Sequence, residues 1–239
     1  MKCTAAFAVA LMLLQPTIGR TEVPALRFVQ ALGVPWEGGR LGWMGFVAFS
    51  PDGTRVASDG PATPNDTSGD LTIWSFPEGR FIKKLPLRPQ ALSADWAYAA
   101  GFHGVIDVTT GAILISLPES EFATFAFSPD SRYVAESAPR TRGDGPHIRV
   151  LELATKKQVV GFGRYNTEAL AFSSDGKLLA SGHWNLVKFW NPATGERVAV
   201  LRGFGRYVRA LAFSPDGKFL AAGMDLPRFG GRVVVTETI

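Results

Sequence analysis

The sequence has little of several features on which large classes of protein depend. Its 239 residues include one cysteine, Cys3, and three histidines, no two of which lie at the spacing of metal ligands, so neither a disulfide framework nor a metal centre is indicated. No apolar run approaches the roughly 18 residues that a membrane-spanning helix requires, which excludes a multispan membrane protein. The 25 basic side chains barely outnumber the 21 acidic ones and form no basic stripe. Recognition of nucleic acid through its phosphates is therefore not expected.

Glycine, proline and aromatic residues, by contrast, are plentiful. The chain has 26 glycines, 16 prolines and 11% aromatic residues, and 46% of its residues are hydrophobic. This is enough apolar material for a packed core and too much for a disordered chain. The combination favours many short strands joined by turns over long helices, and so predicts an all-β fold.

The first nineteen residues have the pattern of an export signal. Lys2 precedes an apolar stretch at 5–14, and small residues follow as far as Gly19. This pattern predicts a signal peptide at 1–19, a single domain at 20–239 and an exported protein, periplasmic or extracellular. A short membrane-proximal anchor is the alternative, although the apolar stretch is too short to span a bilayer. Cleavage would remove the only cysteine, so the fold would be stable by packing alone.

A five-residue turn sequence, Phe-Ser-Pro-Asp-Gly or a close variant, recurs along the chain. It occurs at 49–53, 127–131, 172–176 and 213–217, and the first spacing (78) is about twice the others (45 and 41). The segment 92–95, Leu-Ser-Ala-Asp, fills the gap as an eroded copy. The period of about 35 to 45 residues is the length of one four-stranded propeller blade. Proline, aspartate and glycine each favour chain reversal, which places a tight turn at every copy.

The best-preserved copy predicts four strands, at 169–172, 178–181, 187–190 and 197–201. Its third strand ends in Trp190-Asn191, and Thr194-Gly195 forms the next turn. Together with the Phe-Ser-Pro-Asp-Gly turn, these pairs resemble the WD40 repeat over roughly residues 26–239.

The resemblance implies a β-propeller of four-stranded antiparallel blades, with one departure from the usual pattern. The Gly-His pair that usually precedes the first strand of a WD40 repeat is replaced by Gly161-Phe162 and Gly203-Phe204. We therefore expect hydrophobic packing in place of the buried histidine–aspartate network of that family. His183 is expected to be a turn residue outside any such network.

A count of strands predicts how the propeller closes. The last copy supplies strands at 208–213, 219–222 and 232–236 but no fourth, whereas the strand-like segment 26–32 is left over near the start. Pairing of these two ends would hide two open sheet edges and make a ring of five blades. The alternative is a fragment of a larger ring.

Binding is expected on the face formed by the turns after the second and fourth strands, because these vary in length on a repetitive scaffold. Phe-Gly-Arg-Tyr occurs twice there, at 162–165 and 204–207. Arginine beside aromatic rings suits protein partners and anionic ligands; the alternative is packing between blades. The candidate binding residues are Trp36, Arg40, Trp43, Arg140, Arg142, Arg164, Tyr165, Arg206, Tyr207 and Arg228.

The function that these features predict is a non-enzymatic, exported scaffold that binds a protein or peptide on this face, without cofactor or metal. No phosphate-binding glycine loop or serine elbow occurs in the sequence. One alternative is a propeller that binds a small ligand or glycan by stacking on tryptophan and tyrosine. Another is a hydrolase-like site between blades, for which His103 and Asp107 are the pair to test.

Overall fold

The computed structural model describes residues 46–59, 69–102, 104–117, 123–137, 147–163, 167–226 and 230–238. These residues divide into two compact units, Met1–Arg88 and Pro89–Ile239, each of which is treated by itself. Within the described ranges, no helix is long and apolar enough to cross a membrane. The segments 1–19 and 26–32, for which a signal peptide and a closing strand were predicted, lie outside them.

The first unit contains one four-stranded antiparallel sheet, the first blade. Its strands follow the order β1 (Val47–Phe49), β2 (Arg55–Ser58), β3 (Leu71–Ser75) and β4 (Phe81–Leu85). The central strands are the buried ones: Val56, Leu71 and Ile73 are almost inaccessible to solvent. The outer strand β4 exposes Phe81 and Ile82. Lys83 and Lys84 follow them in the same strand, and lysine at an open sheet edge discourages pairing with other chains.

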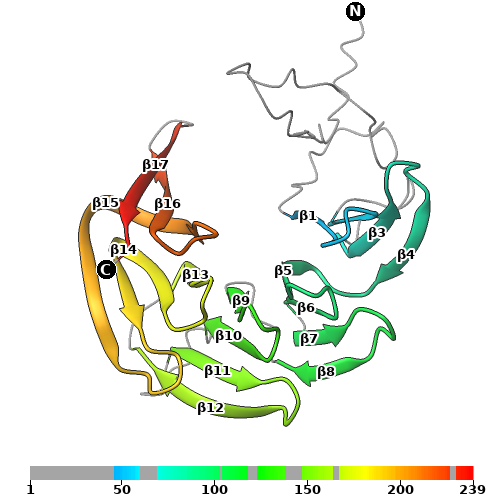
Figure 1. Cartoon of the computed structure of the whole chain (residues 1–239), viewed down its shortest axis with the longest axis horizontal. Coiled ribbons are helices and arrows are strands. Elements are labelled where there is room, and N and C mark those ends of the chain that lie inside the picture. The colour runs from blue at the N-terminus through cyan, green and yellow to red at the C-terminus, as the bar shows by residue number, and fades with distance from the viewer. Residues whose placement is uncertain are drawn as a thin grey trace, which may run out of the picture. The chain divides into compact units, whose positions relative to one another are not determined.

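The second unit contains three further sheets that follow the same meander (Figure 1). The second blade comprises β5 (Pro89–Leu92), β6 (Tyr98–Gly101), β7 (Gly104–Asp107) and β8 (Ile113–Ser116). The third comprises β9 (Phe125–Phe127), β10 (Tyr133–Ser137), β11 (Ile148–Glu152) and β12 (Lys157–Phe162). The last sheet comprises β13 (Ala169–Phe172), β14 (Leu179–Trp190), β15 (Arg197–Phe213), β16 (Phe219–Leu226) and β17 (Gly230–Glu237).

In the last sheet, β14 contains two of the predicted strands. The Ser181 hydroxyl lies 3.5 Å from the Lys188 carbonyl oxygen, whereas seven residues of straight strand would separate them by about 23 Å. The chain therefore reverses within β14, and Asn185, with a φ of 61°, lies at the reversal. The second and third strands predicted for this copy are the two arms of a tight hairpin.

The strand β15 corrects a second expectation. The segment 203–207 was predicted to be a loop between a fourth and a first strand, but β15 continues through it. Its first part pairs with β14 from Arg197 to Tyr207, and its second part pairs with β16 from Val208 to Phe213. One strand thus completes the fourth blade and opens the fifth, which joins the two blades into a five-stranded sheet.

The core of the second unit lies between neighbouring blades. Three clusters of buried residues occupy the three successive interfaces, and each draws side chains from both blades: Val105 with Phe125, Ile148 with Leu179, and Phe189 with Leu220. Alternate residues of a strand point to opposite faces, so the two faces of each inner blade serve two different interfaces. This is the packing that a repeat array requires.

The turn after the first strand has the same hydrogen bonds in all five copies, including the eroded one. In that copy the Ser93 hydroxyl donates to Asp95 Oδ1 at 2.6 Å and accepts from the Tyr98 amide at 2.9 Å. The same pair of bonds recurs around the serines and aspartates of the other four turns. The predicted degenerate copy at 92–95 is therefore confirmed, because it forms the same turn as the other copies.

The predicted all-β fold of four-stranded antiparallel sheets is confirmed. Within the described part of the chain, β17 pairs only with β16. Ring closure by residues 26–32, and with it the number of blades, stays a prediction.

Candidate functional site

Most of the predicted binding residues lie outside the described ranges. These are Trp36, Arg40, Trp43, Arg140, Arg142, Arg164, Tyr165 and Arg228. Arg206 and Tyr207 are described, and both are exposed on β15. His103 of the proposed hydrolase pair is also outside, whereas Asp107 ends β7, and its Oδ1 accepts the Thr110 amide at 2.7 Å.

Two aromatic side chains form an exposed patch where the β14 hairpin meets β15. Tyr207 is opposite Trp184 in the strand register, and their rings meet edge to face with centroids 4.8 Å apart. Trp184 is 51% exposed and Tyr207 is 38% exposed. The Arg209 guanidinium lies 5.5 Å from the centre of the Tyr207 ring and pairs with the Glu168 carboxylate at 3.0 Å. We call Glu168, Trp184, Tyr207 and Arg209 the aromatic patch.

The local backbone explains why these side chains are presented to solvent. His183 is buried, and the alternation of a strand turns the next residue, Trp184, outward. Asn185 Oδ1 accepts the Gly205 amide at 2.6 Å, which ties the hairpin tip to β15. Gly205 has a φ of 74° with no atom within 4 Å of its Cβ position; glycine is required there for backbone conformation and not for space.

The sequence argument found Tyr207 but missed Trp184 and Glu168. Trp184 could have been found from its place beside the predicted turn after the second strand, on the face where binding was expected. Its cross-strand neighbour could not be identified, because the segment that contains Tyr207 was predicted to be a loop.

Beneath the patch, the fourth blade contains a buried hydrogen-bond network. The Trp190 indole Nε1 donates to the Ser181 hydroxyl at 2.7 Å, and Ser181 Oγ shares a hydrogen bond with His183 Nε2 at 2.8 Å. The expectation that His183 is a turn residue is wrong, because His183 is a buried residue of β14 that bonds to Ser181. The histidine belongs to the pair Gly182-His183 at the end of the second strand, instead of to a Gly-His pair before the first strand, so its position in the sequence concealed its role.

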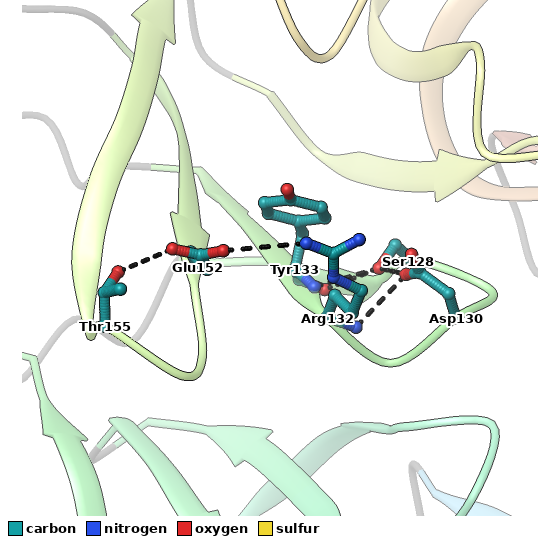
Figure 2. Close-up of polar contacts among 6 residues, drawn as sticks. All are labelled: Ser128, Asp130, Arg132, Tyr133, Glu152 and Thr155. Carbon is teal, nitrogen blue, oxygen red and sulfur yellow. Dashed lines mark hydrogen bonds and ion pairs between the residues drawn. The ribbon is translucent and has the colours of Figure 1, made fainter.

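On the other edge of the blades, the polar side chains of the repeated turns form hydrogen bonds within each turn. In the third blade, Asp130 accepts from the Ser128 hydroxyl and the Arg132 amide, and Glu152 accepts from Thr155 and lies 3.9 Å from Arg132 (Figure 2). The hydrogen bond from Ser50, with that from Thr54, lowers the pKa of Asp52 to about 2. Hydrogen bonds from Ser128, Ser173 and Ser214 lower the pKa of Asp130, Asp175 and Asp216 in the same way. These depressed pKa values result from the hydrogen bonds that form the turns.

Two cations lie at equivalent positions of neighbouring blades but in different surroundings. In the third blade, Arg149 is opposite Glu136 in the register and forms an ion pair with it. Burial raises the pKa of Glu136, and Arg149 opposes that rise. In the fourth blade, burial lowers the pKa of Lys188, and the nearby charges of Arg197 and Arg202 lower it further.

Across the described ranges, no three histidine, cysteine, aspartate or glutamate side chains converge as a metal site would require. The polar groups that do converge, in the network and in the turns, bond to one another. The aromatic patch differs from them in presenting two large aromatic side chains, in contact with each other, to solvent.

Comparison with known proteins identifies the repeat. Residues 166–191 and 195–226 match the family model described as WD domain, G-beta repeat, which confirms the predicted resemblance to the WD40 repeat over these residues. No curated protein matches the sequence. A solved chain of hydrazine synthase from Kuenenia stuttgartiensis is similar over 81% of this chain, with a TM-score of 0.64 and 17% identity. The match spans 62% of that chain, and at this identity the likeness shows the fold alone.

Proposed function

Starting from the WD40 repeats of residues 166–226, we propose that this protein is a non-enzymatic scaffold that binds a protein or peptide partner through the aromatic patch. WD40 repeats generally serve interaction, and the match includes Glu168, Trp184, Tyr207 and Arg209. The single observation that carries the proposal is the exposure of Trp184 and Tyr207 in edge-to-face contact.

The chemistry of the patch favours a protein partner over a sugar. Tryptophan, tyrosine and arginine are the residues most enriched at the energetic centres of protein interfaces. Sugar stacking needs an open, flat ring face, whereas Trp184 and Tyr207 meet at 72°, which suits the irregular apolar surface of a peptide. The Arg209–Glu168 pair adds one charge of each sign at the margin, where charges set orientation more than affinity.

The test compares patch variants with a matched surface variant. Trp184→Ala and Tyr207→Ala should each reduce capture of a partner from the exported fraction at least tenfold, because truncation of an interface anchor costs 2 kcal/mol or more. Val198→Ala, which also removes an exposed apolar side chain from the same sheet, should leave capture unchanged. Equal capture by all four proteins would refute the proposal, and recovery on a glycan array instead would favour the sugar-binding alternative.

We extend the same proposal to the predicted residues near the two Phe-Gly-Arg-Tyr sequences. Arg206 is exposed on β15, next to Tyr207, and Arg164 has the corresponding place in the earlier copy of the sequence. The double substitution Arg164→Ala and Arg206→Ala should weaken partner binding and leave the melting temperature nearly unchanged. Lost stability with retained affinity would identify these arginines as packing residues. Export itself is tested by the N-terminal sequence of the secreted protein, which should begin near residue 20.

We also propose that residues 26–32 pair with the open edge of β17 and complete a fifth blade. Val233 and Val235 of β17 are strongly exposed, and such an edge invites pairing. Deletion of residues 26–32 should lower the melting temperature and promote aggregation. An unchanged, monomeric deletion variant would contradict closure.

A further inference from the structure

The strand β15, which carries Tyr207 of the aromatic patch, is strongly basic. Its 17 residues include four arginines and no aspartate, glutamate or lysine. All four arginine side chains are exposed, those of Arg197, Arg202, Arg206 and Arg209. The strand therefore presents positive charge to solvent, and it does so through arginine alone.

The strand register brings Arg202 close to the aromatic patch. Trp184 is opposite Tyr207, and Leu186 is opposite Arg202. Two residues of chain span at most about 7 Å, so Arg202 and Tyr207 pair with neighbouring positions of β14 although five residues separate them in the sequence. The intervening residues, which include Arg206, form an irregularity in the pairing. We call Arg202 and Arg206 the flanking arginines.

The carboxylate of the aromatic patch is already paired. Glu168 Oε2 lies 3.0 Å from Arg209 Nη1, and the Arg209 guanidinium also lies over the Tyr207 ring. The charges of this pair cancel. Within the described ranges of the chain, neither flanking arginine forms an ion pair. The surface around the aromatic rings therefore carries a net positive charge that comes from the flanking arginines.

We propose that the partner of the aromatic patch is an acidic peptide segment, with an apolar side chain on Trp184 and Tyr207 and carboxylates on the flanking arginines. The inference rests on the proposed scaffold function and adds the chemical class of the partner. Arginine holds a carboxylate through two parallel hydrogen bonds. Complementary charge also speeds the encounter and disfavours partners of the wrong sign, so a basic segment would be rejected.

The aromatic rings supply the apolar half of this recognition. Their centroids are 4.8 Å apart and their planes meet at 72°, so the exposed parts of Trp184 and Tyr207 form a corner instead of a flat surface. A branched or aromatic side chain fills such a corner, and tryptophan, tyrosine and arginine are the residue types enriched at the centres of protein interfaces. The rings thus provide affinity, and the flanking arginines select the charge of the partner.

A single-stranded nucleic acid is the rival ligand, because its bases stack on aromatic rings and its phosphates bind arginine. Two features favour the acidic peptide. The edge-to-face contact of Trp184 with Tyr207 does not present two parallel ring faces to successive bases. The chain as a whole has 25 basic and 21 acidic side chains, without the large basic excess on which binding through several phosphates depends.

The test selects ligands from a random peptide library displayed on phage, with the full chain as bait. Peptides retained by the wild-type chain should be enriched in aspartate and glutamate beside at least one large apolar residue. The double variant Arg202→Gln and Arg206→Gln should lose the acidic enrichment and keep the apolar one, whereas Trp184→Ala should lose both. Lys218→Gln removes an exposed lysine from the turn between β15 and β16 and should leave the selection unchanged.

Isothermal titration calorimetry with the most enriched peptide measures the size of each effect. Binding should be at least about tenfold weaker for Trp184→Ala and about fivefold weaker for the arginine double variant, against less than about twofold for Lys218→Gln. A rise in NaCl from about 50 to about 300 mM should weaken binding to the wild-type chain and have little effect on binding to the arginine double variant.

The other outcomes separate this inference from the proposed function. Neutral or basic peptides that depend on Trp184 would refute the acidic partner and leave the scaffold function in place. Acidic peptides that bind Trp184→Ala as tightly as the wild-type chain would refute the patch as the site, and with it both proposals. Selection of no peptide, or tighter binding of a single-stranded oligothymidylate than of the selected peptide, would overturn the acidic partner. If circular dichroism shows that Trp184→Ala does not fold, Tyr207→Ala replaces it, with the same loss expected.

Discussion

Removal of the Arg149 guanidinium should leave the buried Glu136 carboxylate of the third blade without the positive charge that faces it. The Glu136 side chain is 2% exposed, and the charge that faces it across β10 and β11 is that of Arg149. In Arg149→Met the methionine keeps much of the aliphatic volume, so the principal change is electrostatic. Breaking a buried pair from one side costs 3–5 kcal/mol. Because the Arg149 side chain is itself partly exposed, we expect the low end, about 3 kcal/mol at pH 7.5.

The loss should depend on pH in a defined direction. Burial raises the pKa of Glu136 in the folded state above its unfolded value, so a protonated Glu136 is tolerated and the penalty develops as pH rises through the folded pKa. Loss of Arg149 removes the interaction that opposes this rise. The destabilisation should therefore shrink to about 1 kcal/mol at pH 5.

Urea unfolding at pH 5 and pH 7.5, followed by circular dichroism, measures both quantities. The double variant Glu136→Met and Arg149→Met should recover to within about 1 kcal/mol of the wild-type chain, since a buried pair can be replaced by apolar residues at little cost. Arg132→Met breaks the exposed contact with Glu152 at 3.9 Å and should cost less than about 0.5 kcal/mol. A loss for Arg149→Met that equals this control, or that does not change with pH, would refute the reasoning.

Three further predictions concern stability. The pKa values of the five turn aspartates are lowered in the folded state, that of Asp52 to about 2, so their stabilising effect is complete above the unfolded pKa near 4 and is lost as pH falls towards 2; melting temperatures at pH 5, 3.5 and 2.5 should fall in that order. Ser181→Ala leaves the Trp190 indole without its buried acceptor and should lower the free energy of unfolding by about 1–3 kcal/mol, whereas Ser58→Ala, where the bond from Trp74 is 3.3 Å long, should cost less. Phe189→Ala creates a cavity at the interface between the fourth and fifth blades and should lower the free energy of unfolding, measured in urea, by about 3–5 kcal/mol. The exposed Val198→Ala should lower it by less than about 0.5 kcal/mol.

The sequence was sufficient for the repeat because turn chemistry is local. Serine, aspartate and the residue that follows the turn bond to one another within five positions, so the pattern of residue types specifies the hydrogen bonds directly. Even the eroded copy at 92–95 forms them, since Ser93 and Asp95 supply both essential oxygens. The WD40 resemblance followed from the same local signals.

Local signals misled the prediction where the chain could continue a strand. Glycine at 203 and 205 indicated a loop, but both residues adopt positive φ within β15, and the strand bends there to pass from one blade to the next. A bend and a loop require the same residue types, so only pairing with β14 and β16 distinguishes them. The same ambiguity concealed the contact of Trp184 with Tyr207.

By itself the sequence determined the element type, the period and the turns, because these depend on residues a few positions apart. Tertiary structure decided which polar and aromatic groups meet: Trp190 with Ser181 across the β14 hairpin, and Trp184 with Tyr207. These contacts depend on strand register and on the face of the sheet to which each side chain points. A register shift of one residue would turn each of these side chains to the opposite face.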